Sequence, residues 1–295
     1  MSSIKTLCLS VVVLAMADAH VSPLLAQADS IKRQPFFTWR DVAILEAFAI
    51  ATVAIAPLDT RLAQRLQDAT VQENRAMRRT ATFVETVTDP GAVIIGAGLY
   101  AFGRIAKKHK AADLGLHGTE ALLIGSQLGS LLKGIVGRAR PYVNVDDPHN
   151  YRSFRGFRGG SDFRSFPSGH AIAAFAAASA VTSETKRWWP KSVFVIGPMM
   201  YGGAAAVGWS RMYDNKHWAS DVITGAAIGT FAGLKVVTWH HMHPGNTIDR
   251  IFLGATVGPS PDGGALLRLH FRPVIPRARD LQSSVLLPRR FRSSE

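Results

Sequence analysis

The sequence predicts an all-α protein, a helical bundle of about six core helices followed by a small C-terminal β-hairpin. Six apolar segments rich in Ala, Gly, Ile, Leu and Val recur along the chain, lack the alternation of half-buried strands and are long enough for helices: Val42–Ala56, Gly91–Phe102, Ala121–Val136, Ala171–Val181, Ser192–Trp209 and Val222–Trp239. Near the end, the turn-rich PSPDGG separates two strand-like stretches, Arg250–Gly258 and Ala265–Arg272, which predicts the hairpin.

The first residues have the pattern of an export signal. Lys5 precedes an apolar run from Leu7 to Ala17, and small residues at Ala17 to Ala19 and Ala26 to Ala28 offer cleavage sites. We therefore expect a signal peptide over residues 1–28 and export to the cell envelope. The only cysteine, Cys8, lies in this segment, which excludes disulfides and cysteine chemistry from the mature chain.

The remaining chain divides into a helical domain over residues 36–243 and a tail over residues 244–295. Within the domain, Thr60–Asp89 is polar with spaced apolar positions and predicts one or two surface helices. The tail would hold the hairpin and an arginine-rich end. The net charge of +13 favours anionic partners such as phosphorylated substrates or anionic lipids.

Charge patterning leaves two placements open. The basic connections RIAKKHKAAD and SETKRWWPK would lie inside the cell if the helices span a membrane, and the polar islands described below would then face outward. A spanning first segment would need a cytoplasmic N-terminus, which conflicts with a cleaved signal. The sequence thus favours a periplasmic soluble or peripheral bundle, with an integral inner-membrane protein whose site faces the periplasm as the alternative.

Three polar islands interrupt the apolar segments. In KGIVGRARP, Lys133 and Arg140 are seven residues apart and share a helix face that ends at Pro141. A cation in an apolar helix needs an anion nearby, although snorkelling at a helix end also explains it.

The second island, FPSGHA, begins an apolar helix. Ser168 is a good helix-start residue, so the N–H groups of Ser168, Gly169 and His170 would point out of the helix end and form a phosphate cradle. His170 is placed to exchange a proton. The alternative is an ordinary N-cap beside an incidental histidine.

The third island, SRMYDNKHWASD, places His217 and Asp221 four residues apart on one helical face. A carboxylate that accepts from one imidazole nitrogen makes the other nitrogen a better nucleophile or base. Arg211 adds a cation suited to bidentate phosphate contacts. Because consecutive helices run in alternating directions, all three islands should lie on one side of the bundle.

Taken together, the islands resemble the signature of the type 2 phosphatidic acid phosphatases, a family grouped with bacterial class A acid phosphatases and vanadium haloperoxidases. All three parts occur in order over roughly Ala121 to Trp239: Lys133 with Arg140-Pro141, Pro167 to His170, and Ser210-Arg211 with His217 and Asp221. The resemblance implies the all-α fold of that family.

The resemblance also implies a metal-independent phosphatase without cofactors. His217 would attack phosphorus and form a phosphohistidine, Asp221 would orient it, and His170 would protonate the leaving group. Phosphate binding falls to Lys133, Arg140, Ser168, Gly169 and Arg211. No metal is expected in this site, and vanadate should inhibit the enzyme.

The segment YRSFRGFRGGSDFRSF interleaves arginines with aromatic residues between the first two islands and motivates a lipid phosphate as substrate, with a soluble phosphate ester or a merely solvated loop as alternatives. The rival functions are a vanadium-dependent haloperoxidase and a catalytically idle protein that binds anionic surfaces; nucleic acid is not expected as a partner.

WHHMH offers His240, His241 and His243, but no acidic partner adjoins them in sequence, so a metal site there is not predicted. The oligomeric state is left open.

Overall fold

A computed structural model describes residues 35–88, 91–254, 256–259 and 265–268. The predicted export signal and the arginine-rich end of the chain lie outside the described residues. All contacts below belong to the compact unit that begins at Phe36.

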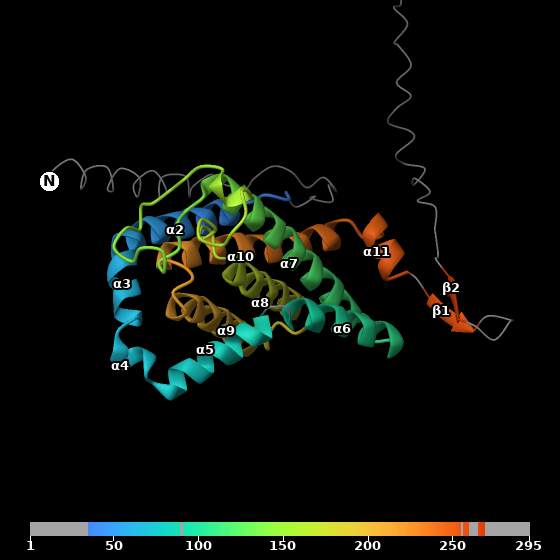
Figure 1. Cartoon of the computed structure of the whole chain (residues 1–295). Helices are drawn as coiled ribbons and strands as arrows, with labels where there is room; N and C mark the ends of the chain where they lie inside the picture. The colour runs from blue at the N-terminus through green and yellow to red at the C-terminus, as the bar shows by residue number, and fades with distance from the viewer. Residues whose placement is uncertain (1–34, 89–90, 255, 260–264, 269–295) are drawn as a thin grey trace, which may run out of the picture. The chain divides into compact units, whose positions relative to one another are not determined.

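The described part of this unit is predominantly helical (Figure 1). Its α-helices are α2 (Trp39–Ile55), α3 (Asp59–Leu66), α4 (Ala69–Gln72), α5 (Arg75–Thr88), α6 (Gly91–Ile105), α7 (His109–Val136), α8 (Gly169–Trp188), α9 (Val193–Tyr213), α10 (Ala219–Met242) and α11 (Thr247–Phe252). Two 3₁₀ turns, Ala56–Leu58 and Arg155–Phe157, complete the set.

Each of the six apolar segments lies in a helix, and the polar stretch after the first of them forms α3, α4 and α5. The largest difference from the sequence prediction concerns α7, which begins at His109 rather than near Ala121. Its first half carries Asp113, His117 and Glu120, polar residues that an apolar criterion passes over. His117 bonds to Glu184 of α8 and Glu120 bonds to His240 of α10, so tertiary contacts stabilise a helix half that hydrophobicity alone does not predict.

Close packing of α8 against α10 forms the centre of the bundle. A Cβ atom at Gly229 of α10 would collide with the carbonyl oxygen of Ile172 on α8, and one at Gly225 would lie 2.6 Å from the carbonyl oxygen of Ser168. Small residues spaced by four allow two helix backbones to touch in this way. Because His170 lies in the first turn of α8 and Asp221 in the first turn of α10, the helix contact also sets the distance between two parts of the signature.

A long connection between α7 and α8 closes one end of the bundle. Gly137 ends α7 in the left-handed conformation (φ 58°), where an L side chain is strained, and a Cβ there would also collide with the carbonyl oxygen of Arg152. The loop returns alongside itself through the bridge between Arg138 and Tyr151. This arrangement holds residues 138–168 over the end of the bundle where the three islands meet.

Two four-residue strands, β1 (Thr256–Pro259) and β2 (Ala265–Arg268), follow α11 and pair antiparallel, with Thr256 opposite Arg268. They fall in the segment for which the sequence predicts a hairpin. Their side chains lie outside the described residues.

Three described helical segments are long and apolar enough to cross a membrane: Trp39–Leu66, Val193–Tyr213 and Ala219–Met242. Many large apolar side chains of the bundle point outward instead of into its core; Phe194 is 80% exposed and Val53 is 74% exposed. Others include Ile50, Ile94, Ile95, Phe102, Ile105 and Met199. A soluble monomer rarely exposes so much contiguous apolar surface, so the bundle has the exterior of a protein that contacts lipid.

Candidate active site

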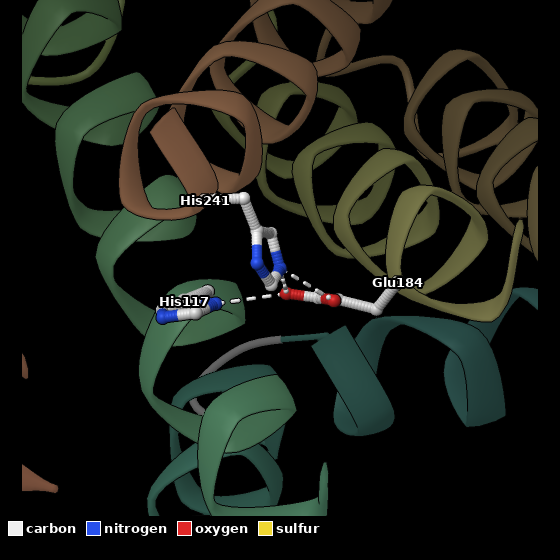
Figure 2. A group of neighbouring side chains, drawn as sticks. All are labelled: His117, Glu184 and His241. Atoms are coloured by element: carbon white, nitrogen blue, oxygen red, sulfur yellow. Dashed lines mark hydrogen bonds and ion pairs between the residues drawn. The ribbon is translucent and has the colours of Figure 1, made fainter. Parts of the chain in front are cut away.

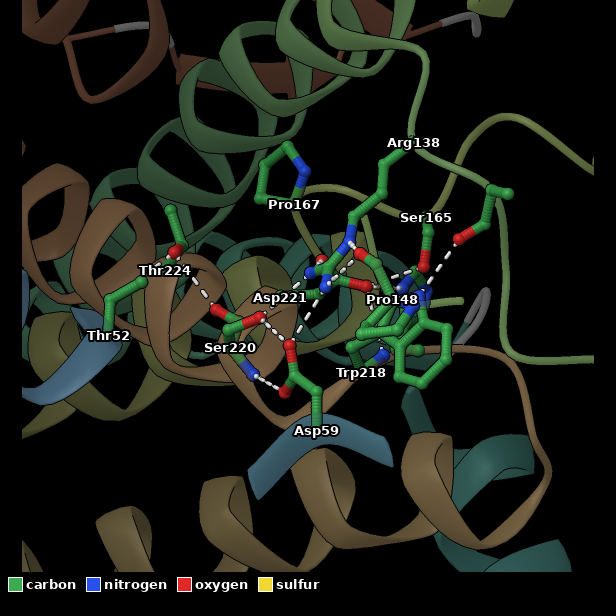
Figure 3. A network of polar contacts seen from close by, with 12 residues as sticks. Thr52, Asp59, Arg138, Pro148, Ser165, Pro167, Trp218, Ser220, Asp221 and Thr224 are labelled. Carbon is green, nitrogen blue, oxygen red and sulfur yellow. Dashed lines mark hydrogen bonds and ion pairs between the residues drawn. The ribbon is translucent and has the colours of Figure 1, made fainter. Parts of the chain in front are cut away.

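The three islands converge at one end of the bundle, as the alternating directions of consecutive helices predict. The first lies at the end of α7 and in the loop after it, the second at the start of α8, and the third between the end of α9 and the start of α10. Figure 3 shows the polar network that joins the islands around Asp221.

His217 precedes the N-cap of α10, Trp218, and its side chain faces Asp221 in the first turn of that helix, so the two residues do not share a helical face as predicted. The Nδ1 atom of His217 lies 3.7 Å from Oδ2 of Asp221, and no other polar atom of the described residues bonds to that nitrogen. Both side chains are buried. The separation is longer than a hydrogen bond, as is common at catalytic pairs before substrate binds. With Nδ1 turned to the carboxylate, Nε2 is the nitrogen left for chemistry.

Asp221 is fixed by three donors. Arg138 donates through Nη1 (2.6 Å), Ser165 through its hydroxyl (2.5 Å), and the backbone N–H of Trp218 caps the helix start (2.9 Å). A carboxylate with this many donors stays ionised and keeps one orientation. The side chain that is predicted to orient His217 is therefore itself held rigidly.

Arg138 and Asp59 complete this network, and the sequence analysis missed both. Arg138 is fully buried; its Nη2 donates to Asp59 (2.8 Å), and its Nη1 also donates to the hydroxyl of Ser220 (2.8 Å). Asp59, at the start of α3, accepts from the backbone N–H of Ser220 as well (2.9 Å). Arg138 lies two residues before Arg140 in the first island, so its position in the sequence could have identified it as a site residue. Nothing in the sequence connects Asp59 with the islands.

Lys133 ties the second island to α7. Its ammonium group donates to the carbonyl oxygens of Pro167 (2.5 Å) and Arg164 (2.9 Å). The positive charge lies beside the start of α8, because a Cβ at Gly169 would be 3.6 Å from Cε of Lys133. Lys133 thus shapes the loop and also adds a cation to the predicted phosphate pocket.

Arg140 and Arg211 supply donors that the protein does not use. The Nε atoms of both are buried, and neither has a hydrogen-bond partner among the described residues. Burial lowers the pKa of Arg140, and the nearby charges of Arg211 and Arg164 add to this effect. The two vacant Nε donors can bind an anion, and a phosphoryl group would provide one.

Glu85, on α5, is a further group that the sequence analysis did not identify. Its carboxylate lies 2.7 Å from Nη1 of Arg211, and Asp214 lies 3.3 Å from the same atom. Burial raises the pKa of Glu85, but the hydrogen bond from Arg211 and the charges of Arg211 and His170 outweigh it and lower the pKa overall. In the described structure, the Glu85 carboxylate therefore contacts Nη1 of Arg211, and a phosphate that binds Arg211 would compete with this carboxylate.

The start of α8 differs in one detail from the predicted cradle. The backbone N–H of Ser168 donates to the carbonyl oxygen of Asp221 (3.0 Å), and the Ser168 hydroxyl accepts from the N–H of Ala171 (3.4 Å). This N–H links the second and third islands instead of pointing into the pocket. The N–H groups of Gly169 and His170 follow in the first turn, where no acceptor exists within the helix, and the positive end of the helix dipole adds to them.

Burial sets the protonation of His217. It lowers the pKa of His217 to about 3, and the charges of Lys133 and Arg140 act in the same direction, while Asp221 opposes them. His217 is consequently neutral at physiological pH, with a lone pair available on Nε2. The arrangement can bind an oxyanion and attack it with an imidazole nitrogen.

No group of this site has the geometry of a metal-binding cluster. Among the described residues, the two such clusters, His117-Glu184-His241 and His117-His240-Asp249, lie at the opposite end of α7 from Lys133.

Comparisons with known proteins agree with these observations. The sequence model of the PAP2 superfamily matches residues 116–244. The chain is 39% identical over 111 residues to a lipid A 1-phosphatase of Rhizobium johnstonii, a match that covers 36% of this chain and 40% of the relative. It is 33% identical over 116 residues to a lipid A 1-phosphatase of Porphyromonas gingivalis, covering 38% of this chain and 22% of the relative. The chain thus spans well under half the length of these relatives.

Among solved structures, the crystal structure of a transmembrane PAP2-type phosphatidylglycerolphosphate phosphatase from Bacillus subtilis aligns with a TM-score of 0.47 and 20% identity, over 71% of this chain and all of that chain. The matched sequence region contains all three islands and the helices that carry them. The match agrees with the resemblance found in the sequence: residues 116–244 are similar to the PAP2 superfamily.

Proposed function

We propose that the protein is a phosphatase that hydrolyses phosphate monoesters or pyrophosphates of lipids through a phosphohistidine on His217, without a metal in the active site. One observation carries this proposal. A neutral, buried histidine faces a fixed carboxylate beside two arginines whose buried Nε donors have no partner in the described structure.

In the first step, Nε2 of His217 attacks phosphorus, and the bond from phosphorus to the leaving oxygen breaks. Asp221 stabilises the positive charge that develops on the ring, since it faces Nδ1. His170, in the first turn of α8, gives a proton to the leaving oxygen. Water then attacks the phosphohistidine, loses a proton to His170 and releases inorganic phosphate, which restores both histidines.

Fixed positive charge lowers the barrier of both steps. The charges of Lys133 and Arg140 act on His217, Arg211 lies near Lys133, and the start of α8 contributes its N–H groups of Gly169 and His170. Such preorganised donors stabilise the negative charge of the phosphoryl oxygens as the transition state forms. In this proposal the cations do the work that a metal performs in many other phosphatases.

An apolar cavity next to the site supports a lipid substrate. It has a volume of about 380 Å³ and runs between α5, α6, α7, α8 and α9. Its lining includes Val207, one turn before Arg211, and Val84, the neighbour of Glu85. A phosphate held by Arg211 would therefore have an acyl chain within reach of an apolar channel, as an amphiphilic substrate requires.

The loop between α7 and α8 adds to this argument. Phe154 and Phe157 are more than half exposed, and Arg152 stacks on the ring of Phe163 (4.8 Å). The curated relatives are named for lipid A, so the phosphate at position 1 of a lipid A-like glycolipid is the substrate we favour.

We further propose that the bundle is integral to the inner membrane, with the site at the periplasmic face. The three candidate spans and the exposed apolar side chains support this placement over the soluble one that the sequence analysis favoured. The helical domain would cover residues 36–243, and residues 244–295 would form an appendage that includes the hairpin.

The test is phosphate release by the purified chain in detergent with excess EDTA, comparing a lipid A-type 1-phosphate, phosphatidate and a soluble aryl phosphate. We expect release to persist in EDTA, to be fastest with a lipid, to be inhibited by vanadate, and to disappear in His217→Ala. Release that needs a divalent cation, or that survives in His217→Ala, would contradict the proposal.

A further inference from the structure

A second cluster of titratable side chains is buried at the end of the bundle remote from the phosphate site. Figure 2 shows His117 of α7, Glu184 of α8 and His241 of α10 turned toward one another. About 24 Å of helix axis separates His117 from Lys133 along α7. The proposed mechanism uses none of these groups.

The distances within the cluster suit a metal ion. Oε1 of Glu184 lies 2.8 Å from Nδ1 of His117 and 3.0 Å from Nε2 of His241. These three ligand atoms all lie within 4.8 Å of one another. Tetrahedral ligands at zinc bond lengths of about 2.0–2.1 Å are about 3.3 Å apart, so the two measured separations would each have to widen by only a few tenths of an ångström.

Burial and charge also favour a cation. Glu184 is 0% exposed, and the hydrogen-bond partners found for its carboxylate among the described residues are imidazole nitrogens of His117 and His241. Asp249 adds a further carboxylate 3.4 Å from Nε2 of His117, and Asp249 and Glu120 both bond to the neighbouring His240. A buried carboxylate without a lysine or arginine partner is costly unless a positive charge compensates it.

The neighbouring histidine and aspartate fit a supporting role better than a ligand role. His240 has Asp249 at 2.7 Å from Nδ1 and Glu120 at 2.7 Å from Nε2, so both of its ring nitrogens are already engaged by carboxylates. Asp249 also lies 3.4 Å from Nε2 of His117. A metal on Nδ1 of His117 would leave its Nε2–H to donate to Asp249, the carboxylate–histidine arrangement that orients metal-bound imidazoles.

We propose that His117, Glu184 and His241 form a binding site for a zinc-like divalent cation. Two imidazoles and one carboxylate are a ligand set that zinc accepts, with a fourth position open to water. The side chain of His241 is 23% exposed and provides the entry path. The ion would join α7, α8 and α10 at the end opposite the phosphate site, and it would take no part in hydrolysis.

The experiment measures metal binding directly. The full chain is purified in detergent, stripped with EDTA, exchanged into EDTA-free buffer and titrated with Zn²⁺ by calorimetry; bound zinc is counted by elemental analysis after gel filtration. Co²⁺ is titrated in parallel, because its visible absorption reports a tetrahedral N/O site. Variants Glu184→Gln and His241→Ala remove ligands, and His240→Ala tests the alternative cluster.

His243→Ala is the matched control, since His243 is exposed and its ring bonds only to the carbonyl oxygen of Trp239. We expect one Zn²⁺ per chain in the wild type and in His243→Ala, with at least tenfold weaker binding in Glu184→Gln and His241→Ala. Phosphate release verifies that each variant is folded.

Three results would overturn the assignment. The first is less than one tenth of an equivalent of bound zinc in the wild type, and the second is an equal loss of zinc affinity in His243→Ala and His241→Ala. The third is a loss of zinc affinity in His240→Ala with no loss in His241→Ala. Phosphate release that persists in EDTA while zinc is lost would leave the proposed function intact and separate the two sites.

Discussion

At the scale of single residues, the site depends on how Asp221 is held. Arg138 bonds to both Asp221 and Asp59 in a fully buried network, so a single guanidinium is the shared ion-pair partner of two carboxylates. Removing one partner of a buried ion pair leaves an uncompensated charge and is far more harmful than replacing the whole set.

We therefore expect Arg138→Met to lower the free energy of unfolding by about 3–5 kcal/mol and to reduce kcat more than KM. The double variant Arg138→Met/Asp59→Asn should recover part of the stability, because one of the two orphaned carboxylates is neutralised, but not the activity. Thermal unfolding in detergent and steady-state kinetics measure both quantities. Arg158→Met, in the exposed part of the loop, serves as the control. Equal losses in the two single variants would refute this role of Arg138.

Protonation of His217 gives a second prediction at this scale. Because burial lowers its pKa to about 3, His217 is deprotonated at every pH above about 4. Its titration should then place no acid limb on kcat/KM above pH 4, and any limb between pH 5 and 7 must come from another group, such as the substrate phosphate or His170. A pH profile of kcat/KM for the wild type and His170→Gln checks this. The prediction fails if the profile keeps an acid limb near pH 6.5 in His170→Gln, and also with a substrate that has no group titrating near that pH. His217 would then have an ordinary pKa.

At the scale of helices, α5 places Glu85 against Arg211, where the substrate phosphate would bind. Glu85→Gln removes the competing charge, so we expect vanadate to bind up to about fivefold more tightly, the range for one partly exposed charge. Glu73→Gln, an exposed carboxylate after α4, is the control. Weaker vanadate binding in Glu85→Gln would mean that Glu85 supports the pocket instead of competing for it.

The contact between α8 and α10 sets the spacing of His170 and Asp221. A methyl group at Gly229 would meet backbone atoms of Ile172 and Ala176, which cannot rotate away. We expect Gly229→Ala to reduce stability by about 1–3 kcal/mol and to lower kcat, whereas Gly202→Ala on α9, where a Cβ meets nothing within 4 Å, should be neutral or stabilising. Melting temperatures and kcat of the two variants are the comparison; a neutral Gly229→Ala would contradict this view of the packing.

The sequence predicted the helices and the three islands because each of these features is local. Apolar composition marks the core segments. The shared helical faces predicted for Lys133 with Arg140 and for His217 with Asp221 were wrong, because α7 ends at Val136 and α10 begins only at Ala219. Short sequence separation still keeps each pair close. Asp59, Glu85 and the partners of Arg138 could not be found in this way, since they come from distant segments; Asp59 and Arg138 are 79 positions apart. The same reason applies to WHHMH: Glu184 and His241 are 57 positions apart, so the carboxylate that completes the cluster is invisible in the local sequence.

At the scale of the whole molecule, the fold separates two tasks. The end where α7 finishes and α8 and α10 begin collects the cations that we propose to bind phosphate, and the opposite end collects the histidine and carboxylate cluster. Apolar side chains cover the outer surface between these ends. In a membrane, this arrangement would present the phosphate site at one face and the second cluster at the other, with lipid around the middle.

The central claim is that phosphorus becomes attached to His217 during turnover. The most direct measurement incubates the chain with a ³²P-labelled lipid phosphate, quenches it rapidly in base and follows the label on the protein. The account predicts a label that is stable in base, lost in acid, mapped by peptide analysis to His217 and absent from His217→Ala. A wild-type enzyme that releases phosphate in single turnovers without any protein-bound label, or a label that remains in His217→Ala, would contradict it.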